Sequence, residues 1–128
     1  MKLLLDTHIA LWAITGDPKL RGPARDLIAD LANTRFVSAV TIWEIALKRR
    51  RSPASIPIPA EQIASLLAAA GYIFLPLLPA HAVAVEALPP IHADPFDRML
   101  VAQALHEPLR LITRDRKVAA YSDTFILA

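Results

Sequence analysis

Residues 2–8 read Lys-Leu-Leu-Leu-Asp-Thr-His, and this stretch decides the fold. The leucines at 3–5 form a short, unbroken apolar run that ends at a charge, which is typical of a strand buried on both faces of a parallel sheet. Asp6 or Thr7 can cap a helix that continues through about Ile14. The chain therefore opens with the strand and helix of an α/β protein.

Apolar runs and helical spacings alternate along the rest of the chain. Strands are expected at 36–38, 72–75, 109–113 and 124–127, and helices at 23–33, 41–50, 59–70, 80–88, 95–106 and 117–121. Thr41 and Asp94 are the expected N-caps of two helices, and Gly71 is the expected C-cap of a third. Strands that alternate with helices predict an α/β sandwich around a mostly parallel sheet, in a single domain over residues 1–128.

The composition excludes several classes of protein. The chain has 128 residues, enough for one hydrophobic core, and no cysteine, which rules out disulfides, thiolate zinc sites and cysteine nucleophiles. The apolar run at the start is interrupted by Asp6 and His8, so it is neither a signal peptide nor a membrane span. We therefore expect a cytoplasmic protein without a membrane segment. The net charge of +2 is compatible with a nucleic-acid partner but does not require one.

Four acidic residues fall where the predicted strands and helices meet. Asp6 directly follows the first strand, and Asp115 follows the 109–113 strand by two residues. Glu44 and Asp97 are expected in the first turns of two helices that open at the same end of the sheet. Because ligands of open parallel sheets bind outside the carboxyl ends of the strands, these acids can converge on one cleft.

Such a cluster requires a positive partner, since close carboxylates raise the pKa of one another. A hard divalent cation, Mg²⁺ or Mn²⁺, prefers carboxylate oxygen and keeps waters for a substrate. The sequence has no Gly-x-Ser-x-Gly motif and no phosphate-binding glycine loop. The acids are therefore the only group that points to catalysis.

Each acid also has a purely structural explanation. Asp6 can be a helix N-cap, and Glu44 can pair with Lys48 one turn further on. Asp94 can cap the 95–106 helix, Asp97 can complement the dipole of that helix, and Asp115 lies in an ordinary turn. The residues alone leave both interpretations open.

The segments around the acids are more specific than the acids themselves. LLLDTHIALW (3–12), VSAVTIWEIALKRR (37–50), HADPFDRMLVAQA (92–104) and LITRD (111–115) resemble, in order and spacing, the PIN-domain ribonucleases. The likeness is greatest to the VapC toxins of bacterial toxin–antitoxin pairs, and it covers nearly the whole chain.

The resemblance implies a three-layer α/β/α sandwich with a mostly parallel central sheet that carries Mg²⁺ or Mn²⁺ at its carboxyl edge. By position, Asp6, Asp97 and Asp115 match metal ligands, and Glu44 matches an acid that binds the metal through water or serves as a base. Asp94 is then a helix cap or an outer-sphere ligand. Side chains next to the matched positions could orient carboxylates or waters: Thr7, Ser38 and Thr113. The implied reaction is hydrolysis of RNA phosphodiesters.

The same resemblance implies partners. We expect an antitoxin segment in an apolar groove beside the amino-terminal helices, and a second copy of the chain in a homodimer. The basic run 48–51 and the arginine that follows Asp97 could bind RNA phosphates: Lys48, Arg49, Arg50, Arg51 and Arg98. The structural alternative for the basic run is a solvated helix end. Arg114 and Arg116 flank the acids and are weaker candidates.

Other conspicuous side chains have ordinary explanations. His8 and His92 are expected to pack or to lie at the surface, because four carboxylates favour a hard ion over imidazole ligands. Trp12 and Trp43 are expected in the core.

Two alternative functions remain. A phosphatase with Asp6 as nucleophile would need a second aspartate two positions on, where this chain has His8. A non-catalytic RNA- or protein-binding module would use the acids only as helix caps.

Overall fold

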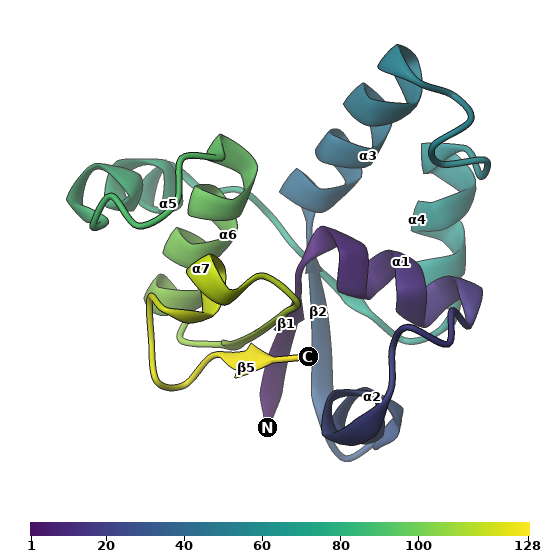
Figure 1. The fold of residues 1–128 in the computed structure, drawn as a ribbon, viewed down its shortest axis with the longest axis horizontal. Helices are drawn as coiled ribbons and strands as arrows, with labels where there is room; N and C mark the ends of the chain where they lie inside the picture. The colour runs from purple at the N-terminus through teal and green to yellow at the C-terminus, as the bar shows by residue number, and fades with distance from the viewer.

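The computed structural model describes residues 1–128. Five short strands are separated by helices (Figure 1): β1 Lys2–Leu5, α1 Thr7–Thr15, α2 Gly22–Ala29, β2 Thr34–Ser38, α3 Ala39–Arg51, α4 Ala60–Ala69, β3 Ile73–Leu75, α5 Pro79–Ala84, the 3₁₀ turn η1 Val85–Ala87, α6 Pro95–His106, β4 Arg110–Thr113, α7 Arg116–Ala119 and β5 Ile126–Leu127. The predicted alternation of strands and helices is confirmed.

All five strands are parallel and lie in the order β3-β2-β1-β4-β5. β1 is central, and Leu5 aligns with Val37 of β2 and with Ile112 of β4. The chain winds outward in one direction through β2 and β3, and it returns to the other side of β1 as β4. The carboxyl ends of β1 and β4 therefore meet where the winding reverses, which is where ligands of open sheets bind.

Helices cover both faces of the sheet, as a sheet with apolar residues on both sides requires. In Figure 1, α1, α2 and α4 lie on one side of β1 and β2, and α6 and α7 lie on the other. The sheet has one apolar core on each face. Because side chains alternate along β1, Leu3 and Leu5 pack into the first core, and Leu4 packs into the second, on the other face. The three-layer α/β/α sandwich is thus built directly on the leucine run.

Two predicted helix boundaries are wrong. Ser38, not Thr41, caps α3, because its hydroxyl accepts a hydrogen bond from the Val40 amide, and Glu44 consequently lies beyond the first turn. The helix expected at 23–33 ends at Ala29, since Asp30 takes an extended backbone and its side chain accepts the Ala32 amide.

The expected core positions are correct in part. Trp43 is 57% exposed, so the prediction of a core position for this residue is wrong. Trp12 is partly buried against the first core. No helix has the length and apolar character needed to cross a membrane.

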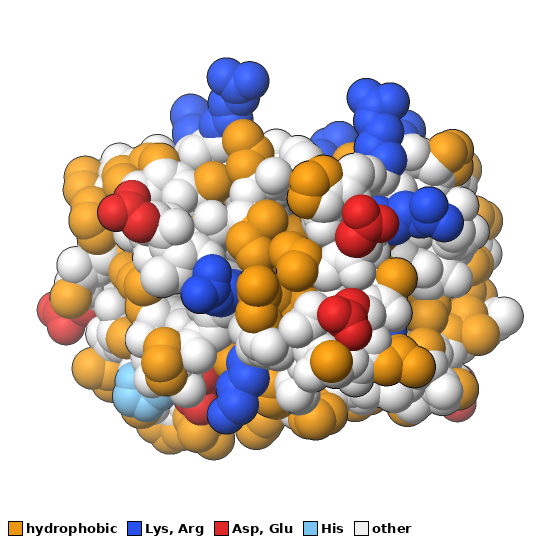
Figure 2. Space-filling view, turned by 90° about the horizontal axis from the view of Figure 1, so that it is seen from below, with side chains coloured by type: hydrophobic (Ala, Val, Ile, Leu, Met, Phe, Trp, Pro, Cys, Tyr) orange, Lys and Arg blue, Asp and Glu red, His pale blue; other side chains and the backbone are white.

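The face seen in Figure 2 lies at the end of the molecule where the chain begins. Acidic and basic side chains are mixed there around a central apolar strip, and no dense basic patch is visible. The polar cavity described below lies instead at the carboxyl end of the strands.

Candidate active site

The carboxyl ends of the strands open into a small polar cavity of about 130 Å³. None of the nine residues that line it is apolar: Asp6, Thr7, His8, Glu44, Lys48, Asp94, Asp97, Arg114 and Asp115. All four predicted acids are therefore brought together, along with Asp94. Five carboxylates face two permanent cations in this space, so the cavity is strongly anionic.

Asp6 stands at the junction of β1 and α1. Its Oδ1 accepts the Ile9 amide at 2.9 Å, which confirms the predicted N-cap. The side chain is buried, and burial raises the pKa of Asp6 to about 6, with a further rise from the Glu44 charge. A hydrogen bond from Thr113 lowers this pKa but does not cancel the effect of burial. Asp6 therefore holds a charge that lacks full compensation.

Glu44 is buried and held by two protein groups. The Thr7 hydroxyl donates to Oε1 at 2.6 Å, and the Lys48 ammonium pairs with Oε2 at 2.7 Å. The predicted Glu44–Lys48 pair is thus present, and Thr7 orients a carboxylate as the resemblance implied. Ser38 does not contact the acids, because its hydroxyl bonds Gln103.

Asp94 and Asp97 occupy different environments at the start of α6. Asp94 Oδ1 accepts the amides of Phe96 and Asp97, at 2.8 and 3.2 Å, so Asp94 is the expected helix cap. The carboxylate of Asp97 accepts no hydrogen bond, and its Oδ2 lies 3.4 Å from His92 Nε2. Partial burial, together with the charge of Asp94, raises the pKa of Asp97 to about 6. This contrast supports Asp97 over Asp94 as the cation ligand.

Asp115 caps the short helix α7, and its Oδ1 accepts the Lys117 amide at 2.8 Å. Its Oδ2 lies 2.8 Å from His92 Nε2. Although partial burial acts in the opposite direction, the hydrogen bond from His92 and those from the helix amides lower the pKa of Asp115. The expectation that His92 would only pack or lie at the surface is therefore wrong, because its ring enters the acid cluster.

His8 also lines the cavity, and it contacts the edge of the Trp12 ring at 6.5 Å between centroids. Burial lowers the pKa of His8, and the charges of Arg114 and Lys48 lower it further. His8 is consequently a neutral wall of the cavity.

The donor set fits a hard divalent cation. For Asp6 and Asp97, burial and neighbouring carboxylates raise the pKa more than the nearby Arg114 and His92 lower it, so a cation bound between them would offset that cost. The Ile9 amide and the Thr113 hydroxyl use two of the lone pairs of the Asp6 carboxylate and leave others for a cation. The chemistry of carboxylate oxygens, without a thiolate and with neutral imidazole at the margin, suits Mg²⁺ or Mn²⁺.

The predicted RNA-binding residues divide into two groups. Arg50 and Arg51 are exposed at the end of α3, whereas Arg49 Nε donates to the Ile56 carbonyl and Lys48 is paired with Glu44. Arg98 does not line the cavity, and its guanidinium is already hydrogen-bonded within the protein. Its guanidinium donates to the Tyr121 hydroxyl, to the Val85 carbonyl of η1 and to three carbonyls of the loop before α6, those of Leu88, Pro89 and His92. Arg98 therefore anchors this loop, and its contact with RNA stays a prediction.

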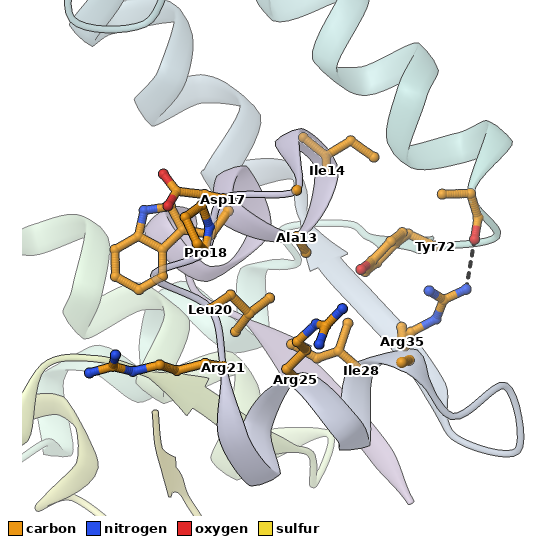
Figure 3. Close-up of a pocket in the computed structure, with 14 residues that line it drawn as sticks. Ala13, Ile14, Asp17, Pro18, Leu20, Arg21, Arg25, Ile28, Arg35 and Tyr72 are labelled. Atoms are coloured by element: carbon orange, nitrogen blue, oxygen red, sulfur yellow. Dashed lines mark hydrogen bonds between the residues drawn. The ribbon is translucent and has the colours of Figure 1, made fainter.

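A second, larger cavity of about 580 Å³ lies beside α1 and α2 (Figure 3). Leu20, Arg25 and Ile28 lie along one side of it, and Arg35 and Tyr72 lie across from them. Of its 14 lining residues, eight are hydrophobic. Trp12 lines this groove, and Arg114, which lines the acid cavity, lies 5.3 Å from the Trp12 ring centroid. The two cavities therefore share a wall.

Comparisons with known proteins identify the family and the fold. The family model for the PIN domain matches residues 3–123. A relative from Mycobacterium tuberculosis, Ribonuclease VapC22, is 28% identical over 123 residues, which cover 93% of this chain and 91% of the relative.

Solved structures with the same fold come from other bacteria. The VapBC2 structure from Rickettsia felis, bound to a DNA fragment from its promoter, has a TM-score of 0.69 at 20% identity and covers 100% of this chain and 98% of the other. A toxin–antitoxin complex from Klebsiella pneumoniae has a TM-score of 0.66 at 21% identity, with coverage of 97% and 95%.

Proposed function

The chain belongs to the PIN domain family, and from this premise we propose that it is a Mg²⁺- or Mn²⁺-dependent endoribonuclease, the toxin of a toxin–antitoxin pair. The observation that carries the proposal is the cavity of five carboxylates, in which burial raises the pKa of Asp6 and Asp97. The relative in Mycobacterium tuberculosis is named as a ribonuclease, which supports the same activity. Because the proposed substrate is RNA, we propose that the protein acts in the cytoplasm.

In this proposal Asp6, Asp97 and Asp115 hold the cation. Once bound, a divalent cation lowers the pKa of water and neutralises charge that develops on a phosphodiester. The chain supplies a small anionic cavity, in which few protein groups donate hydrogen bonds to Asp6 and Asp97 and so compete with a cation for their oxygens. It thereby concentrates a cation at the point where the sheet reverses its winding.

Glu44 has a separate task. Thr7 and Lys48 each occupy one of its oxygens, so its orientation is fixed, and its remaining lone pairs can accept a proton from a water in the cavity. Lys48 brings an ammonium group to the same wall, and Arg114 brings a guanidinium. These two cations are placed to attract an RNA phosphate to the edge of an otherwise anionic site. Arg50 and Arg51, exposed at the end of α3, would extend that attraction.

A purely structural role explains only some of the acids. Asp6, Asp94 and Asp115 do cap helices, as a non-catalytic module would require. Capping does not account for Asp97, whose carboxylate accepts no hydrogen bond, or for the convergence of five acids on one cavity. The same carboxylate can therefore cap a helix and bind a cation.

We further propose that the groove beside α1 and α2 receives a segment of the antitoxin. Its lining is mostly apolar, as a helix or extended segment of a partner requires, and Arg21, Arg25 and Arg35 add positive charge. Because Trp12 and Arg114 join the groove to the acid cavity, a segment that fills the groove can also cover the site. A second copy of the chain completes the proposed assembly.

Metal titration tests the activity. Excess Mn²⁺, about a hundredfold above its dissociation constant, should raise the melting temperature by roughly 5 °C or more, and Asp97→Asn should abolish that rise. Asp123→Asn, an exposed acid outside the cavity, should retain it. If Mn²⁺ leaves the melting temperature of the wild type unchanged, the carboxylate site is wrong.

Induction in bacteria tests the toxin role. The wild-type chain and Asp123→Asn should arrest growth and generate new RNA ends, whereas Asp97→Asn should do neither. Equal toxicity of the wild type and Asp97→Asn would contradict the proposal.

A further inference from the structure

The loop between η1 and α6 delivers an imidazole to the acid cluster. His92 Nε2 lies 2.8 Å from Asp115 Oδ2 and 3.4 Å from Asp97 Oδ2. The His92 side chain is only 16% exposed, so the contact is part of the packed structure and does not lie on the open surface. Ligand atoms of these three residues lie within 4.8 Å of one another, which raises the question whether the ring is a metal ligand or a hydrogen-bond donor.

The other ring nitrogen answers this question. The Asp94 backbone N–H donates to His92 Nδ1 at 3.0 Å, so Nδ1 must present a lone pair. In a neutral imidazole the proton then resides on Nε2, which faces the acids as a donor. Metal ligation through Nε2 would move that proton to Nδ1, directly against the Asp94 N–H. The ring is therefore built to donate and not to coordinate.

Hydrogen bonds from other parts of the chain also hold the backbone around His92 in place. The His92 amide donates to the Tyr121 hydroxyl at 2.9 Å, and that hydroxyl donates to the Pro89 carbonyl at 2.9 Å. Arg98 donates to the His92 carbonyl at 3.3 Å and to the Tyr121 hydroxyl at 3.1 Å. These bonds fix the loop on both sides of the ring, so the position of Nε2 is determined by α6 and by the segment after α7.

Asp115 is the acid that needs such support. Its side chain is 39% exposed, and it begins a helix of only four residues. Its Oδ1 is used for the helix cap, which leaves Oδ2 as the oxygen that faces Asp97. A hydrogen bond from Nε2–H to Oδ2 occupies one lone pair of that oxygen and leaves another for a cation. Hydrogen bonds of this kind orient carboxylates that bind metals.

We propose that His92 is a positioning residue, which donates Nε2–H to Asp115 and holds that carboxylate beside Asp97 so that the two acids can share one divalent cation. The inference rests on the proposed metal-dependent function and adds a residue to it. His92 itself contributes no ligand atom in this arrangement.

Two variants separate the donor from the ligand. In His92→Gln the amide nitrogen can replace Nε2–H, whereas in His92→Asn the amide oxygen can replace Nδ1 and keep the Asp94 bond but cannot reach Asp115. We expect His92→Asn to weaken Mn²⁺ binding roughly 10- to 100-fold by calorimetric titration, and His92→Gln to stay within a few-fold of the wild type. Wild-type affinity in His92→Asn would overturn the proposal. So would an equal, large loss in both variants, because it would make the ring a ligand.

A metal-free measurement keeps the inference separate from the proposed function. In the wild-type protein without metal, long-range ¹H–¹⁵N spectra should show that Nε2 carries the proton of the imidazole and that Nδ1 accepts a hydrogen bond. A ring whose proton lies on Nδ1, with Nε2 unprotonated, would overturn the inference even if Mn²⁺ binds. If the expected tautomer is found but the wild type binds no Mn²⁺, the proposed function fails, whereas the His92–Asp115 hydrogen bond stands.

Discussion

Asp6 shows how one carboxylate can serve the fold and oppose it at once. Its side chain caps α1, yet its burial raises its pKa from 3.8 to about 6. A raised carboxyl pKa means that the native state binds the proton more tightly than the unfolded state. The free energy of unfolding therefore falls as the pH rises from about 4 to about 6, and the loss persists at higher pH.

This sign gives a prediction at the residue scale. Asp6→Asn should raise the free energy of unfolding of the metal-free protein at pH 7.5 by roughly 1–3 kcal/mol, because asparagine caps a helix nearly as well and carries no charge to bury. Near pH 4 the two proteins should be about equally stable. Urea unfolding at both pH values measures the difference, with Asp123→Asn as the control for loss of an exposed charge. A destabilised Asp6→Asn at pH 7.5 would show that the carboxylate already has a sufficient partner.

Residue contacts differ in how far the sequence could predict them. The caps at Asp6 and Asp94 and the Glu44–Lys48 pair follow from spacings of four residues or fewer, and all three are present. The contacts of Thr7 with Glu44 and of His92 with Asp115 join residues 37 and 23 positions apart. Local spacing carries no information about such pairs. His92 is just two residues before Asp94, and that proximity was the one signal that could have marked it.

At the scale of elements, the strands were predicted better than the helix ends. The leucine run and the apolar segment before Thr113 identify β1 and β4, because a strand buried on both faces needs an unbroken apolar run. The end of α2 was missed because Leu31 continues the helical spacing of Leu27 and Ile28, although it is 80% exposed. The Asp30 side chain forms a local turn that ends the helix. Such side-chain to backbone hydrogen bonds compete with helix formation, and the spacing of apolar residues gives no sign of them.

The loop before α6 is the element whose stability we expect to depend on one side chain. Arg98→Lys should lower the free energy of unfolding by roughly 1–3 kcal/mol, since an ammonium group cannot reproduce the fork of bonds to several carbonyls and Tyr121. Arg51→Lys, at the exposed end of α3, should change it by less than about 0.5 kcal/mol. Chemical unfolding of both variants provides the measurement. Equal stability of Arg98→Lys and the wild type, with weaker RNA binding, would return Arg98 to the RNA-binding residues.

For the whole molecule, the site follows from the topology and the partner surfaces do not. Once β1 and β4 are neighbours, the reversal of the winding places the acids at one edge, and the alternation of strands and helices predicted this arrangement. The groove combines side chains from α1, α2, β2 and the end of α4, so its shape depends on the packing of four elements. No pattern within any single element could have predicted that shape.

The surface at β3 gives the last prediction, which concerns the proposed homodimer. Five of the twelve exposed large apolar residues fall within the segment of chain that runs from β3 into α5: Ile73, Phe74, Leu77, Leu78 and Val83. β3 is also an edge strand with one side unpaired, and such an edge is usually covered. We therefore expect the second copy of the chain to contact this stretch.

Light scattering after gel filtration should give the wild type about twice the chain mass of 14.0 kDa. Val83→Glu should give the mass of a single chain, because Val83 is 70% exposed and a charge there would be buried without a partner in the dimer. Leu31→Glu, on a residue that is 80% exposed after α2, provides the matched control and should stay dimeric. If Leu31→Glu dissociates and Val83→Glu does not, the dimer contact lies on the other side of the sheet, next to the groove. The antitoxin segment and the second copy would then compete for the same face.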